Sequence, residues 1–89
     1  MRLLRMMPGY GETLIVEGDP AVEVERERLM REFRRQLDSG MWAGVPTTDP
    51  ESGRREAMLV TDFAQVPAEA ERVIFWPRAM GGAAAPAGA

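Results

Sequence analysis

The stretch DPAVEVERERLMREFRRQL, residues 19–37, is the one long segment of this chain with the pattern of an amphipathic helix. Asp19 is predicted to cap this helix, because its carboxylate can accept hydrogen bonds from the free N–H groups of the first turn. Pro20 would then occupy the first helical position, where its missing N–H is not needed. The apolar residues recur close to the 3.6-residue period and form one stripe, namely Val22, Leu29, Met30, Phe33 and Leu37.

The remaining faces of the predicted helix carry charged side chains. Acidic and basic residues three or four positions apart can form ion pairs along a helix, and the predicted pairs are Glu23–Arg26, Glu25–Arg28 and Glu27–Arg31. This charge pattern is typical of a face exposed to water. Gly40 is predicted to end the helix, because glycine adopts the left-handed conformation of a helix end without steric cost.

Ahead of the helix, the sequence predicts an antiparallel hairpin. Residues 2–7 (RLLRMM) and residues 13–16 (TLIV) are rich in aliphatic side chains and predict two strands. The segment between them, Pro8-Gly9-Tyr10-Gly11, is dense in turn-forming residues. The two strands are therefore expected to pair around it.

After the helix, apolar and polar segments alternate. Residues 41–46 (MWAGVP) predict either a short strand or a packed loop, and residues 47–55 (TTDPESGRR) predict a polar loop. The other predicted elements are a strand at 57–60 (AMLV), a connection with about one helical turn at 63–70, and a last strand at 72–76 (RVIFW). Pro77 is expected to end strand pairing, because proline has no N–H to donate.

The predicted order is strand, strand, helix, strand, strand, with residues 41–46 as a further candidate strand, and the fold class is α+β. This order resembles the β-grasp fold, which implies a mixed sheet packed on one main helix, with the last strand lying centrally beside the first. A ferredoxin-like fold needs a second full helix, and residues 63–70 are too short and too interrupted by proline to form one. With 89 residues, a single domain is expected.

The residue types that are missing limit the chemistry of the chain. It contains no Cys and no His, and all 11 basic residues are Arg. Thiolate nucleophiles, imidazole bases and Schiff-base lysines are therefore excluded, and we expect no enzymatic activity and no cofactor. The acidic residues Asp49, Glu51 and Asp62 have a spacing that matches no metal-binding loop, so no metal site is predicted.

Charge and hydropathy argue against nucleic-acid and membrane partners. The net charge is −3 and the basic residues form no long block, whereas phosphate binding needs a concentrated basic surface. No apolar run reaches the roughly 20 residues that span a bilayer, and residues 1–7 are too short for a signal peptide. A cytoplasmic location is therefore expected.

The C-terminal part runs from an apolar strand ending in VIFWP, residues 73–77, to the pair Gly81-Gly82. Over residues 1–82, this layout resembles that of ubiquitin-like proteins, including small bacterial ones of the same length. The resemblance implies a domain that ends in a conjugation arm at about residues 77–82, with Gly81 and Gly82 as the conjugation and processing residues. Residues 83–89 form an Ala/Gly/Pro tail, which a peptidase has to remove first.

The resemblance also implies a function and its partners. In this family an adenylating enzyme activates the terminal carboxylate, the acyl group passes to a thiol, and an amine finally accepts it. The chain is then a small protein modifier, and its expected partners are an E1-like adenylating enzyme and a processing peptidase. Because the chain contains no Lys, it is expected to act mainly as a single mark.

An alternative function fits the same sequence. The Gly pair also suits a flexible chain end, and the protein is then a non-enzymatic binding or structural module, such as a small subunit, an adaptor or a phage-type assembly component. The candidate partner-binding residues are Tyr10, Trp76 and Arg78, with structural alternatives as a turn residue, a packed aromatic residue and a solvated side chain. Trp42 is likewise either packed or exposed to a partner.

Overall fold

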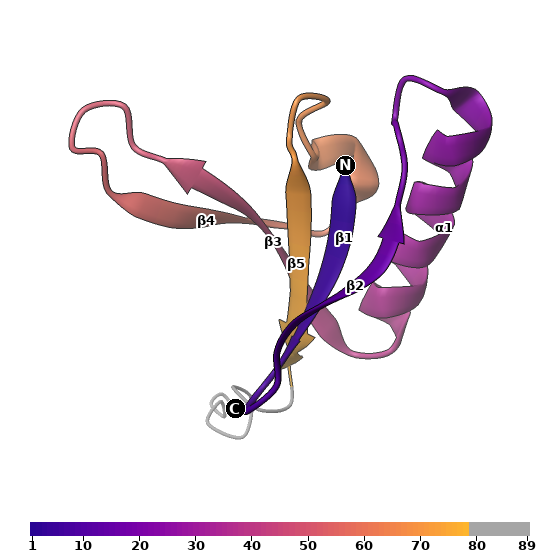
Figure 1. The fold of residues 1–89 in the computed structure, drawn as a ribbon, viewed down its shortest axis with the longest axis horizontal. Coiled ribbons are helices and arrows are strands. Elements are labelled where there is room, and N and C mark those ends of the chain that lie inside the picture. The colour runs from indigo at the N-terminus through magenta and orange to yellow at the C-terminus, as the bar shows by residue number, and fades with distance from the viewer. Residues whose placement is uncertain (79–89) are drawn as a thin grey trace.

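The structure, a computed structural model, describes residues 1–78 and consists of a five-stranded mixed sheet with one helix packed on it (Figure 1). The predicted α+β class is therefore confirmed. The predicted residues Gly81 and Gly82 lie outside the described residues. The elements are β1 (Arg2–Met7), β2 (Gly11–Glu17), α1 (Glu23–Asp38), β3 (Met41–Thr48), β4 (Arg55–Val60), the short 3₁₀ helix η1 (Phe63–Gln65) and β5 (Arg72–Pro77).

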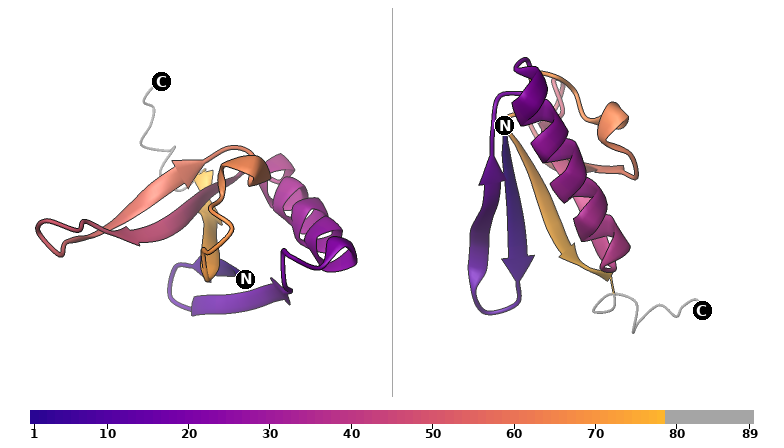
Figure 2. Two further views of the ribbon diagram at one scale, coloured as in Figure 1. Left: turned by 90° about the horizontal axis from the view of Figure 1, so that it is seen from above. Right: turned by 90° about the vertical axis from the view of Figure 1, so that its right-hand side faces the viewer.

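The strand order in the sheet is β2-β1-β5-β3-β4, a β-grasp-like arrangement. The last strand, β5, lies in the centre, where it pairs parallel with β1 and antiparallel with β3. The first two strands form the predicted antiparallel hairpin, and β3 and β4 form a second one. Seen along the sheet, helix α1 lies across one side of it (Figure 2).

Helix α1 begins at Glu23, so the predicted cap at Asp19 is wrong. The Asp19 carboxylate accepts a hydrogen bond from the N–H of Ala21 (2.9 Å), and its carbonyl oxygen accepts one from the N–H of Val22 (3.0 Å). An aspartate that bonds the backbone two residues onward forms a local turn of its own, which competes with capping. Pro20 therefore lies in this turn, and Val22 precedes the helix in an extended conformation without a side-chain cap.

The apolar stripe of α1 is narrower than predicted. Leu29 and Phe33 are buried, but Met30 is 45% exposed and does not contribute to the core. The third buried residue of the helix is Gln36, whose side-chain amide donates to Glu32 (2.7 Å). The three predicted ion pairs of the helix do not form; within residues 1–78, the ion pair of α1 joins Glu32 to Arg35 (3.6 Å). Gly40 has a φ of +92° and ends the helix as predicted.

The core lies between α1 and the two central strands. Leu3 of β1 and Val73 and Phe75 of β5 are fully buried beneath the helix. The ring of Phe33 meets the ring of Phe75 edge-on, with the two centroids 5.6 Å apart. It meets Phe63 of η1 in the same way at 5.7 Å. One helix residue thus packs against both the central strand and the segment that leads into it.

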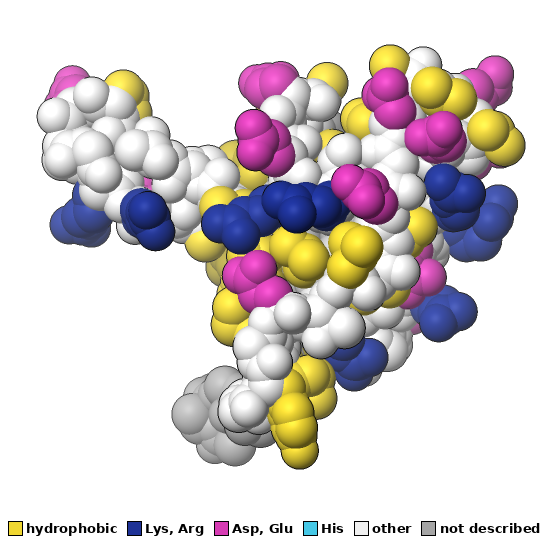
Figure 3. Space-filling model, viewed as in Figure 1, with side chains coloured by type: hydrophobic (Ala, Val, Ile, Leu, Met, Phe, Trp, Pro, Cys, Tyr) yellow, Lys and Arg dark blue, Asp and Glu magenta, His cyan; other side chains and the backbone are white. Residues whose placement is uncertain are grey.

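Residues 41–48 form strand β3, which decides between the two predictions for residues 41–46. Pairing of β3 with β5 ends at Gly44, whereas its pairing with β4 continues to Thr48. Pro46 has no N–H with which to extend a ladder toward β5. The last part of β3 and the first part of β4, which pair with each other, therefore form an arm that projects away from the rest of the sheet (Figures 1 and 3). The predicted loop at 47–55 is correspondingly shorter, since strand residues flank it on both sides.

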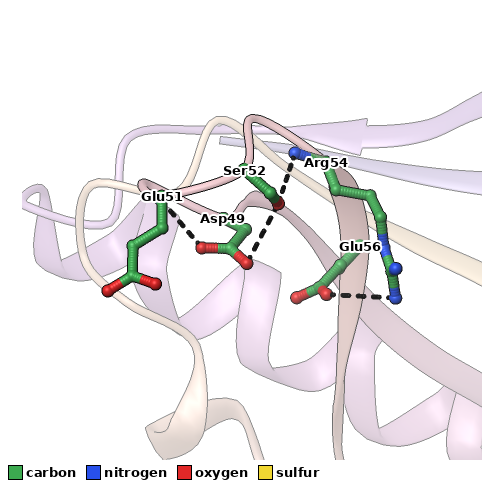
Figure 4. A network of polar contacts seen from close by, with 5 residues as sticks. All are labelled: Asp49, Glu51, Ser52, Arg54 and Glu56. Carbon is green, nitrogen blue, oxygen red and sulfur yellow. Dashed lines mark hydrogen bonds and ion pairs between the residues drawn. The ribbon is translucent and has the colours of Figure 1, made fainter.

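The tip of this arm is held by Asp49 (Figure 4). Its carboxylate accepts hydrogen bonds from the backbone N–H of Glu51 (2.9 Å) and from the hydroxyl of Ser52 (3.1 Å). The hydroxyl oxygen of Ser52 in turn accepts from the N–H of Arg54 (3.2 Å). The bond from Glu51, followed by the bond from Ser52, lowers the pKa of Asp49 below its ordinary value. The carboxylate is thus occupied in the turn.

Replacing Phe33 with alanine is expected to lower the free energy of unfolding by about 3–5 kcal/mol, because it removes both aromatic contacts and leaves a cavity. Urea denaturation followed by circular dichroism measures this change. Met30→Ala, on the same helix but facing water, is the matched control and should stay within about 0.5 kcal/mol of the parent protein. Similar losses for both variants would contradict the assignment of the core.

Replacing Asp49 with alanine is expected to loosen the tip of the arm and to accelerate tryptic cleavage after Arg54 and Arg55 several-fold. Asp49→Asn keeps an acceptor oxygen and should be cleaved at nearly the parent rate. If both variants are cleaved like the parent protein, the carboxylate does not hold the turn.

The same turn is expected to depend on pH. Because folding lowers the pKa of Asp49, its contribution is present above the ordinary value of 3.8 and is lost as the pH falls through the lowered value. The amide signals of Glu51 and Ser52, followed by NMR from neutral pH into acid, should move with a midpoint below 3.8. A midpoint at or above that value would contradict the hydrogen bonds.

Candidate functional site

The side of the sheet opposite to α1 carries the candidate functional residues. Side chains alternate along β5, so that Val73 and Phe75 face the helix while Arg72, Ile74 and Trp76 face the other side. We call this second side the open face. Hydrophobic side chains gather there over β1, β2 and β5, next to a band of basic side chains (Figure 3).

Trp76 is half-buried on the open face, where its indole lies against the backbone of Gly44 on the neighbouring strand β3. A Cβ atom at Gly44 would lie only 2.9 Å from two atoms of the ring. The absence of a side chain at position 44 therefore lets the ring approach the strand. Trp76 was predicted to be either a partner-binding residue or a packed aromatic residue, and most of its ring is packed.

Trp42 lies directly across from Trp76 in the β3–β5 ladder and is 38% exposed. The guanidinium carbon of Arg78 lies 4.7 Å from the centroid of a Trp42 ring, which is a cation–π contact. The N–H of Arg78 also donates to the carbonyl oxygen of Gly40 (2.9 Å). Arg78 is therefore exposed but held by two contacts, and is not simply a solvated side chain.

Tyr10 lies in the turn between β1 and β2 and is 83% exposed. Its N–H donates to the carbonyl oxygen of Met7 (3.0 Å), so its backbone belongs to the turn while its ring faces solvent. Because β1 and β5 run parallel, this turn lies at the same end of the sheet as Arg78. The structure thus brings Tyr10, Trp76 and Arg78 to one end of the sheet.

Beside this end the open face is hollowed. A cavity of about 300 Å³ is lined mainly by apolar side chains, including Met6, Pro46, Ile74 and Trp76. At its border, Arg72 reaches across the sheet to Glu12 on β2, with 3.4 Å between nitrogen and oxygen. An aromatic and aliphatic surface with charged groups at its border has the composition of a protein-binding surface.

Several residues of this surface were not among the candidates predicted from the sequence. Gly44 and Arg72 were not singled out, although the alternation within RVIFW predicts that Arg72, Ile74 and Trp76 share one face. The contact between Arg72 and Glu12 joins residues 60 positions apart and has no local signal. Asp49 and Glu51 lie at the tip of the β3–β4 arm, while Asp62 accepts a hydrogen bond at the start of η1. Within residues 1–78, no group of three potential metal ligands comes together.

Replacing Gly44 with alanine is expected to lower the free energy of unfolding by about 1–3 kcal/mol, because the added methyl group displaces the indole of Trp76. Urea denaturation measures the change. In a Trp76→Leu background the same substitution should have a much smaller effect, since the clashing ring is gone. Equal effects of Gly44→Ala in the two backgrounds would show that the ring does not lie against Gly44.

Comparison of the chain with family models, with curated proteins and with solved structures gives no match. In the part of the chain that the structure describes, no helix has the length and apolar character needed to cross a membrane.

Proposed function

We propose that the protein is a small ubiquitin-like protein modifier of the bacterial kind, made as a precursor and cleaved after Gly82 before activation and conjugation. The observation that supports this most is the sheet order β2-β1-β5-β3-β4. In this order the chain leaves the sheet from its central strand, at the end where Tyr10 and Trp42 are exposed.

The small number of residues between this end and Gly82 agrees with the proposal. Gly82 follows Arg78 by four residues, so its carbonyl carbon lies at most about 14 Å farther along the chain. An enzyme that binds the exposed aromatic residues and Arg78 can therefore also reach Gly82. Binding energy from the folded domain then positions the reacting group.

The proposed chemistry begins with a peptidase that hydrolyses the bond between Gly82 and Ala83 and releases residues 83–89. The new carboxylate of Gly82 attacks the α-phosphate of a nucleoside triphosphate on an adenylating enzyme, which forms an acyl-nucleotide and releases pyrophosphate. A thiol of the enzyme system then displaces the nucleotide, and an amine of the target displaces the thiol. Gly81 and Gly82 present backbone without side chains, which suits a narrow active-site channel.

The partly apolar open face supports a second candidate function, a non-enzymatic binding module such as a small subunit or adaptor. In that case a partner protein covers Trp42, Ile74 and the cavity beside them, and the Gly pair has no role. Both candidates use the same end of the sheet, but only the modifier function requires cleavage after Gly82, followed by activation and conjugation.

Intact-mass analysis of the full chain separates the two functions. The modifier function predicts that a peptidase encoded beside this protein removes residues 83–89, and that Gly82→Val abolishes cleavage while circular dichroism stays unchanged. Ala85→Val, within the released tail, is the matched control and should be cleaved normally. If no candidate peptidase shortens the chain, and if Gly82→Val keeps normal function in the cell, the protein is not a modifier.

A further inference from the structure

The sheet has two edges with different character. Within residues 1–78, β2 and β4 each pair with a strand on one side only. The register between β1 and β2 shifts between Leu3 and Leu4, which leaves Ile15 of β2 as an extra residue. Bulges of this kind protect an edge from pairing with other chains. The register between β3 and β4 is continuous over the whole of β4, so this edge lacks such protection.

The free edge of β4 is also apolar. Four apolar residues follow one another from Ala57 to Val60. Leu59 is 58% exposed on the open face, and Met58, which points to the other side, is 37% exposed. Because the β3–β4 arm projects from the sheet (Figure 1), part of this edge stands clear of the rest of the domain. An unpaired, regular and apolar edge is a surface on which another strand can pair.

We propose that β4 pairs antiparallel with β4 of a second copy of this chain, about a twofold axis at Met58. Directly opposed residues of an antiparallel pair lie on the same face of the sheet. The twofold axis of a self-paired strand must therefore pass through a residue, not between two residues. Val60 is the last residue of β4, so an axis there would pair β4 with residues beyond the strand. The possible centres within the apolar run are therefore Ala57, Met58 and Leu59.

The charges beside the apolar run select Met58 as the centre. With the axis at Met58, Arg54 of each copy lies opposite Asp62 of the other, so two pairs of opposite charge flank the strands. With the axis at Leu59, Glu56 lies opposite Asp62 and like charges face each other. With the axis at Ala57, Arg55 lies opposite Leu59 and no pair of opposite charge forms. The axis at Met58 also leaves one charged residue, Glu56, opposite an apolar one, Val60, but of the three axes it alone forms pairs of opposite charge. Opposite charges across strands stabilise pairing and like charges weaken it.

The side chains in the middle of the strand agree with this register. An axis at Met58 places each Ala57 opposite Leu59 of the other copy, so a small side chain faces a large one. Asp62 lies two residues beyond the end of β4 and has an extended backbone, at φ −146° and ψ 141°. Its carboxylate also accepts a hydrogen bond from the N–H of Ala64 at the start of η1 (3.2 Å). The side chain of Arg54 is exposed, and in the single chain its Nη2 lies 3.8 Å from Oε2 of Glu56. The complementarity of β4 with itself thus identifies a second copy as the occupant of this edge.

A twofold axis closes the assembly at two copies, because each free β4 edge is used once. Six-residue strands bury little surface, so the dimer is a weak one that forms and dissociates with protein concentration. It does not depend on the modifier function, because cleavage after Gly82 leaves β4 unchanged.

Single cysteines test both the dimer and its register, since the chain contains no Cys. Opposed residues in an antiparallel pair have Cα atoms about 4.5–5.5 Å apart, which lies within the range that a disulfide spans. Met58→Cys should therefore form a disulfide-linked dimer under mild oxidation. In Glu56→Cys, the matched control on the same edge, the two cysteines are about 13 Å apart along the strands and should not react.

The expected result is a dimer yield at least about tenfold higher for Met58→Cys than for Glu56→Cys. Equal yields, or no dimer from folded Met58→Cys, would overturn the proposal.

Sedimentation of the full chain gives a second readout. The mass should rise with concentration, Arg54→Asp should weaken association, and the combined Arg54→Asp and Asp62→Arg variant should restore it. A monomer at every concentration would overturn the proposal and leave an extended segment of another protein as the occupant of the edge.

Discussion

The parallel pairing of β1 with β5 is the contact on which the remainder of the sheet depends. It places Arg2 to Arg5 beside Arg72 to Phe75, and so joins two segments about 70 residues apart in the chain. Closing a loop of that length has an entropic cost, which burial of Leu3, Val73 and Phe75 under the helix offsets. The other strands attach to this pair, β2 to β1, β3 to β5 and β4 to β3.

One helix covers one side of this sheet, and that determines where apolar residues remain accessible. A chain of this size has few residues with which to cover a second side. The alternation of β5 nevertheless places Ile74 and Trp76 on that side. The close approach of Trp76 to Gly44 covers part of the indole, while Trp42 is covered only in part by Arg78. The half-covered open face is thus a consequence of the fold.

Much of the fold could be predicted from local patterns. The 3.6-residue period identified Leu29 and Phe33, and the turn residues around Tyr10 identified the first hairpin, because these signals arise from neighbouring residues. The predicted start of α1 was wrong because the local turn at Asp19 competes with capping. The prediction that Met30 belongs to the apolar stripe under the sheet was wrong, because the 3.6-residue period does not show how narrow the covered face of the helix is. The full length of β3 depends on pairing with β4 and β5, which residues 41–48 do not encode locally.

The candidate site was predictable only in part, for the same physical reason. Aromatic residues near the end of the chain were recognisable as candidates, but their meeting with Tyr10 depends on the parallel pairing of β1 and β5. The role of Gly44 depends on the ring of Trp76 on another strand, and that of Glu12 depends on Arg72, which is 60 residues away. Local sequence gives no measure of such contacts, because they exist only once the sheet has formed.

The two proposed surfaces are compatible within one molecule. Arg78 lies beside Gly40, ahead of the first residue of β3, whereas Met58 is opposite Val45, near the base of the projecting arm. Pairing through β4 therefore leaves the end of the sheet with Trp42 and Arg78 outside the paired strands. Because the two β4 strands would run in opposite directions, the two chain ends would leave the dimer in opposite directions as well. An enzyme could then act on Gly82 of one copy without separating the pair, so self-association and processing need not compete.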